Sequence, residues 1–115
     1  MDSKQIVKAA VKILDSKKAI DVRIIDISKV TVIADYFIIA GASNERQCKA
    51  LADNVEEALA KEGIVPKAIE GYANANWILM DYRDVIIHIF NQDQRLFYDL
   101  ERIWTDGKIV EAAEL

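Results

Sequence analysis

The chain has 115 residues, 52% of them hydrophobic and 30% charged, with a net charge of −4 at pH 7. This balance is typical of one folded domain with a single core and excludes an intrinsically disordered chain. The acidic character argues against a broad nucleic-acid-binding surface. No apolar run is long enough to span a bilayer, and the lone Cys48 excludes an internal disulfide and a zinc site. The amino terminus has no secretory or transit pattern, so we expect a protein of the reducing cytoplasm.

The first part of the chain predicts a helix followed by two strands. Apolar residues recur at helical spacing over residues 2–17, and Asp2 or Ser3 can cap the first turn. Residues 21–27 have the character of a strand, and so have residues 36–40, which are apolar throughout. A strand without polar residues is expected in the centre of a sheet, where both of its faces are covered.

A second helix is predicted over residues 44–62, directly after a break in the strand pattern. Asn44 and Gln47 have the spacing of a capping box at its start, and Gly63 is placed to end it. A short strand over residues 68–71 follows. The helix therefore separates two groups of strands.

The first predicted helix also carries a stripe of lysines. Lys4, Lys8 and Lys12 recur at i, i+4 spacing and therefore lie on one helix face. Residues 1–19 hold five lysines against two aspartates, a local charge of +3. Most such stripes are solvated faces, and the alternative is a contact with RNA.

Two apolar runs, residues 77–82 and 85–90, are separated by Arg83 and Asp84. Two strands joined by two residues are typical of a β-hairpin. With these two residues as the turn, opposite residues share a face, and one face is almost wholly apolar. That face consists of Ile78, Met80, Tyr82, Val85, Ile87 and Ile89. We expect it to be part of the core.

The other face of the hairpin, which we call the mixed face, combines aromatic, aliphatic and polar residues. It carries Trp77, Leu79, Asp81, Ile86, His88 and Phe90. Aromatic and polar side chains together are the composition of a contact surface. The alternative is an ordinary amphipathic strand pair whose second face a helix covers. Periodicity alone does not choose between the two interpretations.

After the hairpin the apolar spacing changes to that of a helix, which predicts a third helix over residues 92–104. Residues 108–115 have little to hold them in place, so we expect a short flexible tail behind a single domain of residues 1–107. The predicted fold is a compact α+β domain, a mixed sheet of about five strands with three helices.

The residues offer no catalytic centre. A strand that leads through Gly41 and Ser43 into a helix could hold a phosphate, but the dinucleotide fingerprint and the P-loop lysine are missing. The paired acids with which a nucleotidyltransferase holds Mg²⁺ are missing as well. His88 is the sole histidine and the carboxylates near it are scattered, which is more typical of hydrogen-bonded structure than of a metal site. We expect no enzyme activity, no cofactor and no metal.

Several short motifs together closely resemble the Iojap family. In chain order they are DYFII at 35–39, SNERQ at 43–47, EG at 70–71, WILMD at 77–81, DVIIH at 84–88 and YDLERIW at 98–104. The resemblance covers essentially the whole chain. One departure is Arg83, where the family often has a glycine in the hairpin turn. The bacterial members of the family are called ribosomal silencing factors.

The resemblance implies a fold similar to that of nucleotidyltransferases without their catalytic acids. It also implies a translation repressor that binds the large ribosomal subunit through ribosomal protein L14 and keeps the small subunit from docking when nutrients are short. Members of the family are often homodimers when free. An acidic protein suits this role if it docks on a basic ribosomal protein and not on bare RNA, with at most a peripheral contact to ribosomal RNA.

The sequence is compatible with three functions. In the leading hypothesis the chain is an interaction module that blocks subunit joining. Its expected partner-binding residues are Trp77, Asp81, His88, Asp35, Tyr36 and Phe90, with Trp77 as the hot spot. The second hypothesis is a nucleotide-binding or nucleotidyl-transferring enzyme that uses the Gly41 turn with Asp81 or Asp84. The third is a dimerisation domain that uses the mixed face on a second copy of itself.

Overall fold

Two helices pack on one side of a six-stranded mixed sheet in the part of the chain that the computed structural model describes, residues 1–91, 108–111 and 115. The elements are α1 (Ser3–Ser16), β1 (Ile20–Asp26), β2 (Tyr36–Ala42), α2 (Glu45–Lys61), β3 (Ala68–Glu70), β4 (Trp77–Asp81), β5 (Val85–Asn91) and β6 (Lys108–Val110). The strand order across the sheet is β3-β4-β5-β2-β1-β6. Strands β2 and β5 are parallel and the other neighbours are antiparallel. The predicted α+β class is confirmed.

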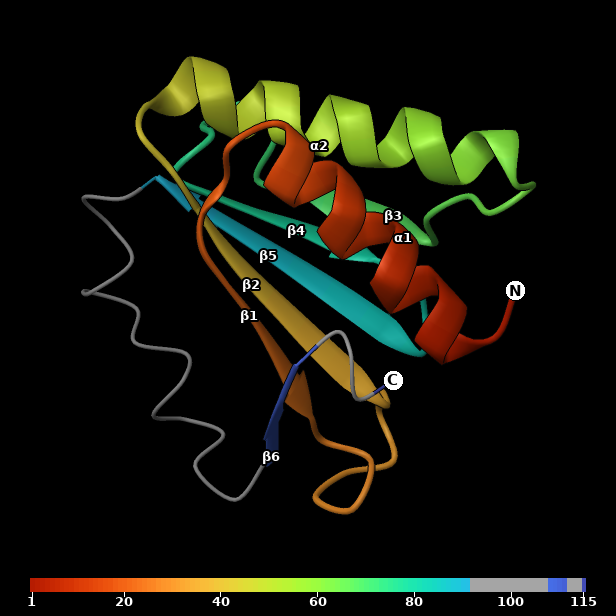
Figure 1. Cartoon of the computed structure of the whole chain (residues 1–115). Coiled ribbons are helices and arrows are strands. Elements are labelled where there is room, and N and C mark those ends of the chain that lie inside the picture. The colour runs from red at the N-terminus through yellow and green to blue at the C-terminus, as the bar shows by residue number, and fades with distance from the viewer. Residues whose placement is uncertain (92–107, 112–114) are drawn as a thin grey trace.

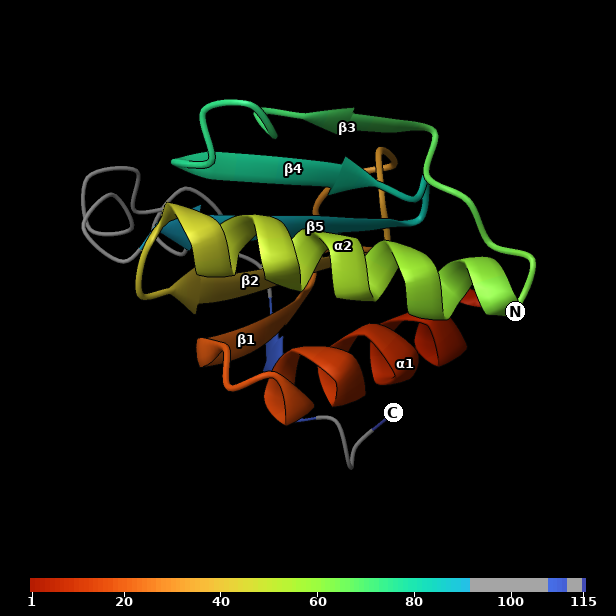
Figure 2. The ribbon, with the colours of Figure 1, turned by 90° about the horizontal axis from the view of Figure 1, so that it is seen from above.

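Both helices lie on the same side of the sheet (Figure 1). Seen from above they run side by side, with α2 nearer to β5 and α1 nearer to β1 (Figure 2). Their apolar stripes face the sheet, and most of the residues predicted to form these stripes are buried, with Ile13 and Ala58 partly buried. None of the described helices has the length and apolar character needed to cross a bilayer.

Both helices begin where the sequence predicts, but the complete capping box forms at α1 and not at α2. The capping box forms at α1, where Asp2 accepts the backbone N–H of Gln5 at 2.9 Å and the Gln5 side chain accepts the N–H of Asp2 at 3.0 Å. At α2, Asn44 is the N-cap and accepts the N–H of Gln47 at 2.8 Å. The Gln47 side chain bonds the N–H of Ser43 instead, at 2.6 Å. The predicted box at α2 is therefore displaced by one residue.

The number of strands differs from the prediction because of the carboxyl-terminal segment. Residues 108–110, expected within a flexible tail, form β6 and pair with β1 through Ile24↔Val110 and Ile25↔Ile109. The β6 backbone supplies the hydrogen bonds that the outer edge of β1 would otherwise lack. Within the described residues the sheet therefore has six strands and not about five. The third helix predicted over residues 92–104 lies outside the described residues.

The hairpin has the register that its alternation predicts. Trp77 pairs with Phe90, and Met80 pairs with Ile87. The Tyr82 N–H donates to the Val85 carbonyl at 2.9 Å, which closes the turn at Arg83 and Asp84. All six residues of the apolar face are buried in the core beneath the helices. That part of the prediction is confirmed.

The turn itself is strained at one residue. Arg83 has a φ of +72°, a backbone conformation that side chains with a Cβ rarely adopt. The carboxylate of Asp81 accepts the Arg83 N–H at 2.7 Å and thereby holds the turn. A glycine would adopt this φ without strain, which explains physically why the turn suits glycine at this position.

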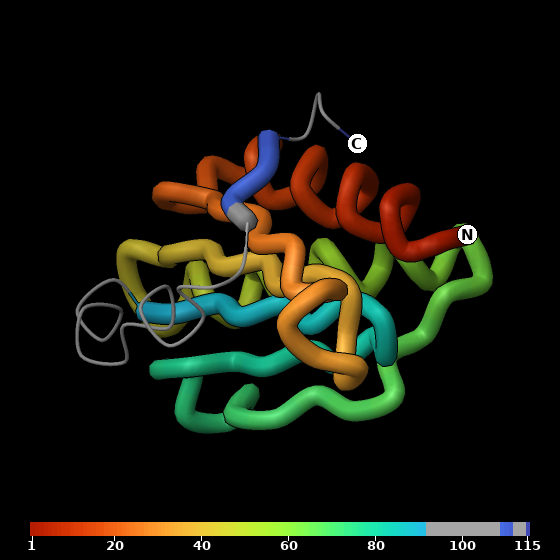
Figure 3. The backbone as a smooth tube through the Cα atoms, turned by 90° about the horizontal axis from the view of Figure 1, so that it is seen from below, coloured from red at the N-terminus to blue at the C-terminus, as the bar shows by residue number. Residues whose placement is uncertain are grey.

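The loop between β1 and β2 lies beside the hairpin turn (Figure 3). The N–H groups of Asp35 and Tyr36 both donate to the Asp84 carbonyl, at 2.7 and 3.1 Å. These bonds join the start of β2 and the residue before it to the turn between β4 and β5, which lies 48 and 49 residues further along the chain. In the same loop Val32 and Ile33 are exposed.

Candidate functional site

The hydrogen bond from the Trp77 indole to His88 is the central contact of the mixed face. The indole Nε1–H donates to Nδ1 of His88 over 3.0 Å. The two residues come from neighbouring strands, β4 and β5, and are offset diagonally because His88 itself pairs with Leu79. Trp77 is partly exposed, whereas His88 is only 3% exposed.

The hydrogen bond that Nδ1 accepts from Trp77 determines which ring nitrogen of His88 carries the proton. An imidazole nitrogen that accepts a hydrogen bond cannot carry a proton, so neutral His88 has its proton on Nε2. Nε2 is buried and has no hydrogen-bond partner among the residues that the structure describes. Burial also lowers the pKa of His88 from its ordinary value to about 4. The ring is therefore neutral at physiological pH and acts as a hydrogen-bond acceptor.

Aromatic rings surround this pair. Trp77 stacks on Phe90 with ring centroids 5.3 Å apart, and Phe37 of β2 meets His88 edge-on at 4.8 Å. Phe37 belongs to this group because β2 runs parallel to β5, which places Phe37 beside Ile86 and Ile39 beside His88. Sequence reasoning missed Phe37, since no local pattern shows that these two strands are neighbours.

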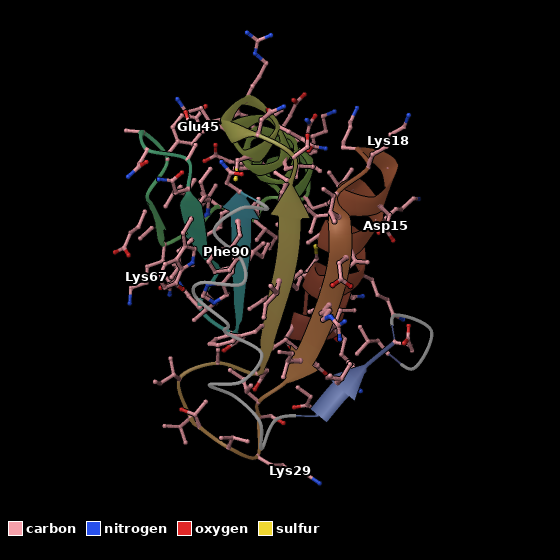
Figure 4. The ribbon with its side chains drawn as sticks, turned by 90° about the vertical axis from the view of Figure 1, so that its left-hand side faces the viewer. Asp15, Lys18, Lys29, Glu45, Lys67 and Phe90 are labelled. Carbon is pink, nitrogen blue, oxygen red and sulfur yellow. The ribbon has the colours of Figure 1, made fainter. Side chains whose placement is uncertain are left out.

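Burial differs along the mixed face. Phe90, a residue of β5, is 1% exposed and lies among the central strands (Figure 4). It belongs to a second apolar cluster, on the side of the sheet opposite the helices. The buried members of this cluster are Ile25, Ile27, Ala34, Phe37, Ile39 and Phe90, with Trp77 and Ile86 packed against them. Phe90 therefore has little surface with which to touch a partner.

Two of the expected site residues lie at the opposite end of the hairpin. Asp81 is on the same face as Trp77 but four residues along β4, which is about 13 Å at the rise of a strand. Asp35 is brought close to this end by its bond to Asp84. Both aspartates are partly exposed. The site is therefore an aromatic group at one end of the face and carboxylates at the other.

The structure does not bring Tyr36 onto this face. Tyr36 packs in the core cluster beneath the helices and is 6% exposed, whereas the next residue, Phe37, faces the opposite side. Burial first, and then the charges of Asp26, Asp35 and Asp2, raise the pKa of Tyr36. Tyr36 and Phe37 face opposite sides of the sheet because adjacent residues of a strand alternate between its two sides.

A shallow hollow of about 200 Å³ adjoins the carboxylate end of the mixed face. It is lined by Ile33, Lys67, Asp81, Arg83, Asp84 and Ile86. Lys67 lies at the β3 and β4 edge of the molecule, and Lys29 lies in the loop beyond β1 (Figure 4). Sequence reasoning missed Ile33 and Lys67, which come from segments distant in sequence from the hairpin.

The Gly41 turn is not arranged to hold a phosphate. Gly41 and Ala42 are the last residues of β2, and the Ser43 N–H, which would point at a phosphate, is bonded to Gln47. Within the described residues, no group of three or more His, Cys, Asp or Glu side chains gathers as a metal site. Asp93, a carboxylate that follows the hairpin in sequence, lies outside them.

Comparisons with known proteins agree along the whole chain. A family model described as "Ribosomal silencing factor during starvation" matches residues 1–115. The ribosomal silencing factor RsfS of Halalkalibacterium halodurans is 36% identical over 111 residues, 96% of this chain and 95% of that protein. The chloroplastic protein Iojap of Zea mays is 31% identical over 95 residues, 82% of this chain and 41% of that protein.

A solved structure supports the same relationship at the level of the fold. The crystal structure of a protein from Chromobacterium violaceum superposes with a TM-score of 0.88 at 33% identity, over 91% of this chain and 88% of that one. The match to the Halalkalibacterium protein and the shared fold therefore both extend over nearly the full length of this chain. The chain belongs to the RsfS family of ribosomal silencing factors, which regulate translation and are not enzymes.

Proposed function

We propose that this chain represses translation by docking on the large ribosomal subunit through ribosomal protein L14, which sterically prevents the small subunit from joining when nutrients are short. Membership of the RsfS family supports association with the ribosome. The docking contact is the mixed face, with Trp77 as its anchor and Asp81 and Asp35 at its edge. The protein works in the cytoplasm, where the subunits join.

One observation supports the mixed face as the docking contact: Trp77 stays partly exposed beside side chains that are fully buried. Tryptophan is enriched among binding hot spots because its large rigid ring buries much area at little entropic cost. Phe90 and His88 are too buried to contribute contact area, so they support Trp77 from within. Tyr36 supports the sheet from the helix side.

The charges favour a basic protein as the target. Asp35, Asp81 and Asp84 form no ion pair within the described part of the chain, where the salt bridges are Arg23–Asp21 and Lys61–Glu57. These carboxylates are therefore available to pair with cationic side chains of a partner. With a net charge of −4, the chain as a whole is repelled by bare RNA.

The test is a pulldown of separated large and small subunits with the parent and two variants. We expect the parent to retain the large subunit alone. Trp77→Ala should weaken this binding by about 2 kcal/mol or more, because it removes the anchor. Leu79→Ala is the matched control, since Leu79 is a partly exposed residue on the same face of β4. Leu79→Ala should weaken binding of the large subunit much less than Trp77→Ala does.

Unfolding midpoints measured on the same preparations decide what a loss of binding means. Trp77→Ala should keep a cooperative unfolding transition. A folded Trp77→Ala variant that binds like the parent would refute the site. Retention of the small subunit alone would refute the proposed function itself.

We also propose that the free chain forms a homodimer. If the two copies pair through the mixed face, Trp77→Ala dissociates the dimer as well as the complex with the large subunit. Sedimentation analysis of the parent and the variant measures this directly. A dimer that persists in the variant means that another surface joins the copies.

A further inference from the structure

We propose that His88 is a positioning residue that holds the Trp77 indole in one orientation, the one in which it meets the ribosomal partner. This inference rests on the proposed function and deepens it. It assigns to His88 a role through Trp77 and no contact of its own with the partner.

The burial of His88 supports this assignment. At 3% exposure the imidazole has almost no surface to offer a partner. Its neighbours across the strands, Leu79 and Ile39, are aliphatic, so an aliphatic residue would fill the same position without burying a polar ring. Burying the Nε2 donor without a partner in the described part of the chain is a cost to stability. What a histidine provides at this position, and an aliphatic residue does not, is the acceptor Nδ1 for the Trp77 indole.

The direction of the hydrogen bond explains what the acceptor does. The Trp77 ring stacks on Phe90 at an interplanar angle of 24°, and stacked rings can slide and turn over one another at little cost. A hydrogen bond is directional, because it weakens steeply when the donor–hydrogen–acceptor angle departs from linear. The 3.0 Å bond to Nδ1 therefore determines where the Nε1 edge of the indole points.

An ordered indole improves binding because it has less freedom to lose. A hot-spot side chain that is already held in its bound rotamer does not pay the entropy of ordering when the partner arrives. A partly exposed tryptophan at the end of a strand has several rotamers without such a restraint. His88 removes these alternatives before the encounter.

Three substitutions separate the acceptor from the bulk of the side chain. His88→Asn places a side-chain oxygen close to the position of Nδ1 and keeps the acceptor. His88→Gln keeps a polar amide but carries its oxygen further out, toward the position of Nε2. His88→Leu keeps a buried side chain and removes the acceptor. The three variants are compared with the parent and, for His88→Leu, in a Trp77→Ala background.

The spectroscopic measurement is a ¹H–¹⁵N correlation of the indole N–H groups. The chain has two tryptophans, so two signals are expected, and Trp77→Phe assigns them. In the parent and in His88→Asn the Trp77 signal should be shifted downfield and protected from solvent exchange. In His88→Gln and His88→Leu it should move upfield and exchange faster.

The functional measurement is affinity for isolated large subunits. We expect His88→Leu and His88→Gln to lose about tenfold, the magnitude of one hydrogen bond, and His88→Asn to keep nearly all of the parent's affinity. In the Trp77→Ala background His88→Leu should cause no further loss, because a positioning residue acts only through the group that it holds.

Several results would overturn the inference. These are equal loss in His88→Asn and His88→Leu, full affinity in His88→Leu, or a further loss in the Trp77→Ala background. If His88→Leu does not fold, the comparison of His88→Asn with His88→Gln decides. If the parent itself does not bind large subunits, the proposed function fails. The indole signals then decide alone whether His88 orients Trp77.

Discussion

Gly71 lies directly against the backbone of Trp77, so closely that a β-carbon at residue 71 would overlap the Trp77 carbonyl oxygen. Gly71 also has a φ of +78°, and its carbonyl accepts the N–H of Ala75 at 2.9 Å. The turn from Gly71 to Asn76 therefore packs on the start of β4. The backbone position of the proposed anchor depends on a residue that has no side chain.

We expect Gly71→Ala to destabilise the domain by at least about 2 kcal/mol, because it adds a backbone overlap to an unfavourable φ. Gly63 is the matched control, since its φ is +77° and a β-carbon there would meet nothing within 4 Å. Gly63→Ala should cost about 1 kcal/mol, from φ alone. Denaturant unfolding of both variants measures the difference. Equal losses would show that the close approach to Trp77 has no energetic importance.

Ile87→Ala should lower the free energy of unfolding by roughly 2–5 kcal/mol, the cost of deleting a large buried aliphatic side chain. Ile87 is fully buried between its partners Met80 and Ile38 on the helix side of the sheet. Ile86→Ala, on the other side and only partly buried, should cost less. A loss below about 1 kcal/mol for Ile87→Ala would contradict the assignment of the two faces.

Arg83→Gly should stabilise the domain by about 0.5–1 kcal/mol, because glycine adopts the observed positive φ without strain. The gain is reduced by the greater freedom of glycine in the unfolded chain. The turn bond from the residue 83 N–H to Asp81 is kept, since it uses only the backbone of residue 83. Arg83→Ala removes the same side chain but keeps the strain, so thermal unfolding should show no gain for it.

Acid should weaken the fold through His88. Its pKa is lowered to about 4 in the folded protein by burial, against about 6.5 in an unfolded chain. Between these values the unfolded state binds more protons, so stability is complete above about pH 6.5 and falls as the pH drops toward 4. The loss is on the order of 3 kcal/mol.

The His88→Asn variant isolates this contribution, because asparagine does not titrate. Unfolding free energies measured at several pH values between 4 and 7 should show a shallower slope for the variant than for the parent. Parallel slopes would mean that His88 is protonated equally in the folded and unfolded states.

Neutralising Lys4, Lys8 and Lys12 together with glutamine should slow association with the large subunit and flatten its dependence on salt, because the RNA of the subunit attracts these lysines although the docking target is a basic protein. All three side chains are exposed on α1, whereas the proposed anchor Trp77 packs on the second apolar cluster, on the opposite side of the sheet. Their effect is therefore long-range and screened. Rates of association measured at several salt concentrations test this. Complete loss of binding at low salt would make RNA the principal target.

Local features of the sequence were sufficient for the hairpin. Two strands joined by two residues have one natural register, and alternation then divides their side chains between two faces. The pairs Trp77↔Phe90 and Met80↔Ile87 follow from this alone and are confirmed. The N-cap of α2 at Asn44 is likewise predicted, because a polar side chain there can accept a hydrogen bond from one of the first free N–H groups of the helix.

The tertiary structure decided what local patterns do not encode. The parallel pairing of β2 with β5 brings Phe37 and Ile39 beside the mixed face, and β6 joins the edge of β1 with only three residues. Neither pairing has a local sequence signal, because the backbone hydrogen-bonding groups of one strand can pair with those of any other strand. Burial on both sides of a sheet is likewise a property of the assembled layers. The sequence shows that Trp77 and His88 share a face, but only the packing of the other strands makes one a partly exposed donor and the other a buried acceptor.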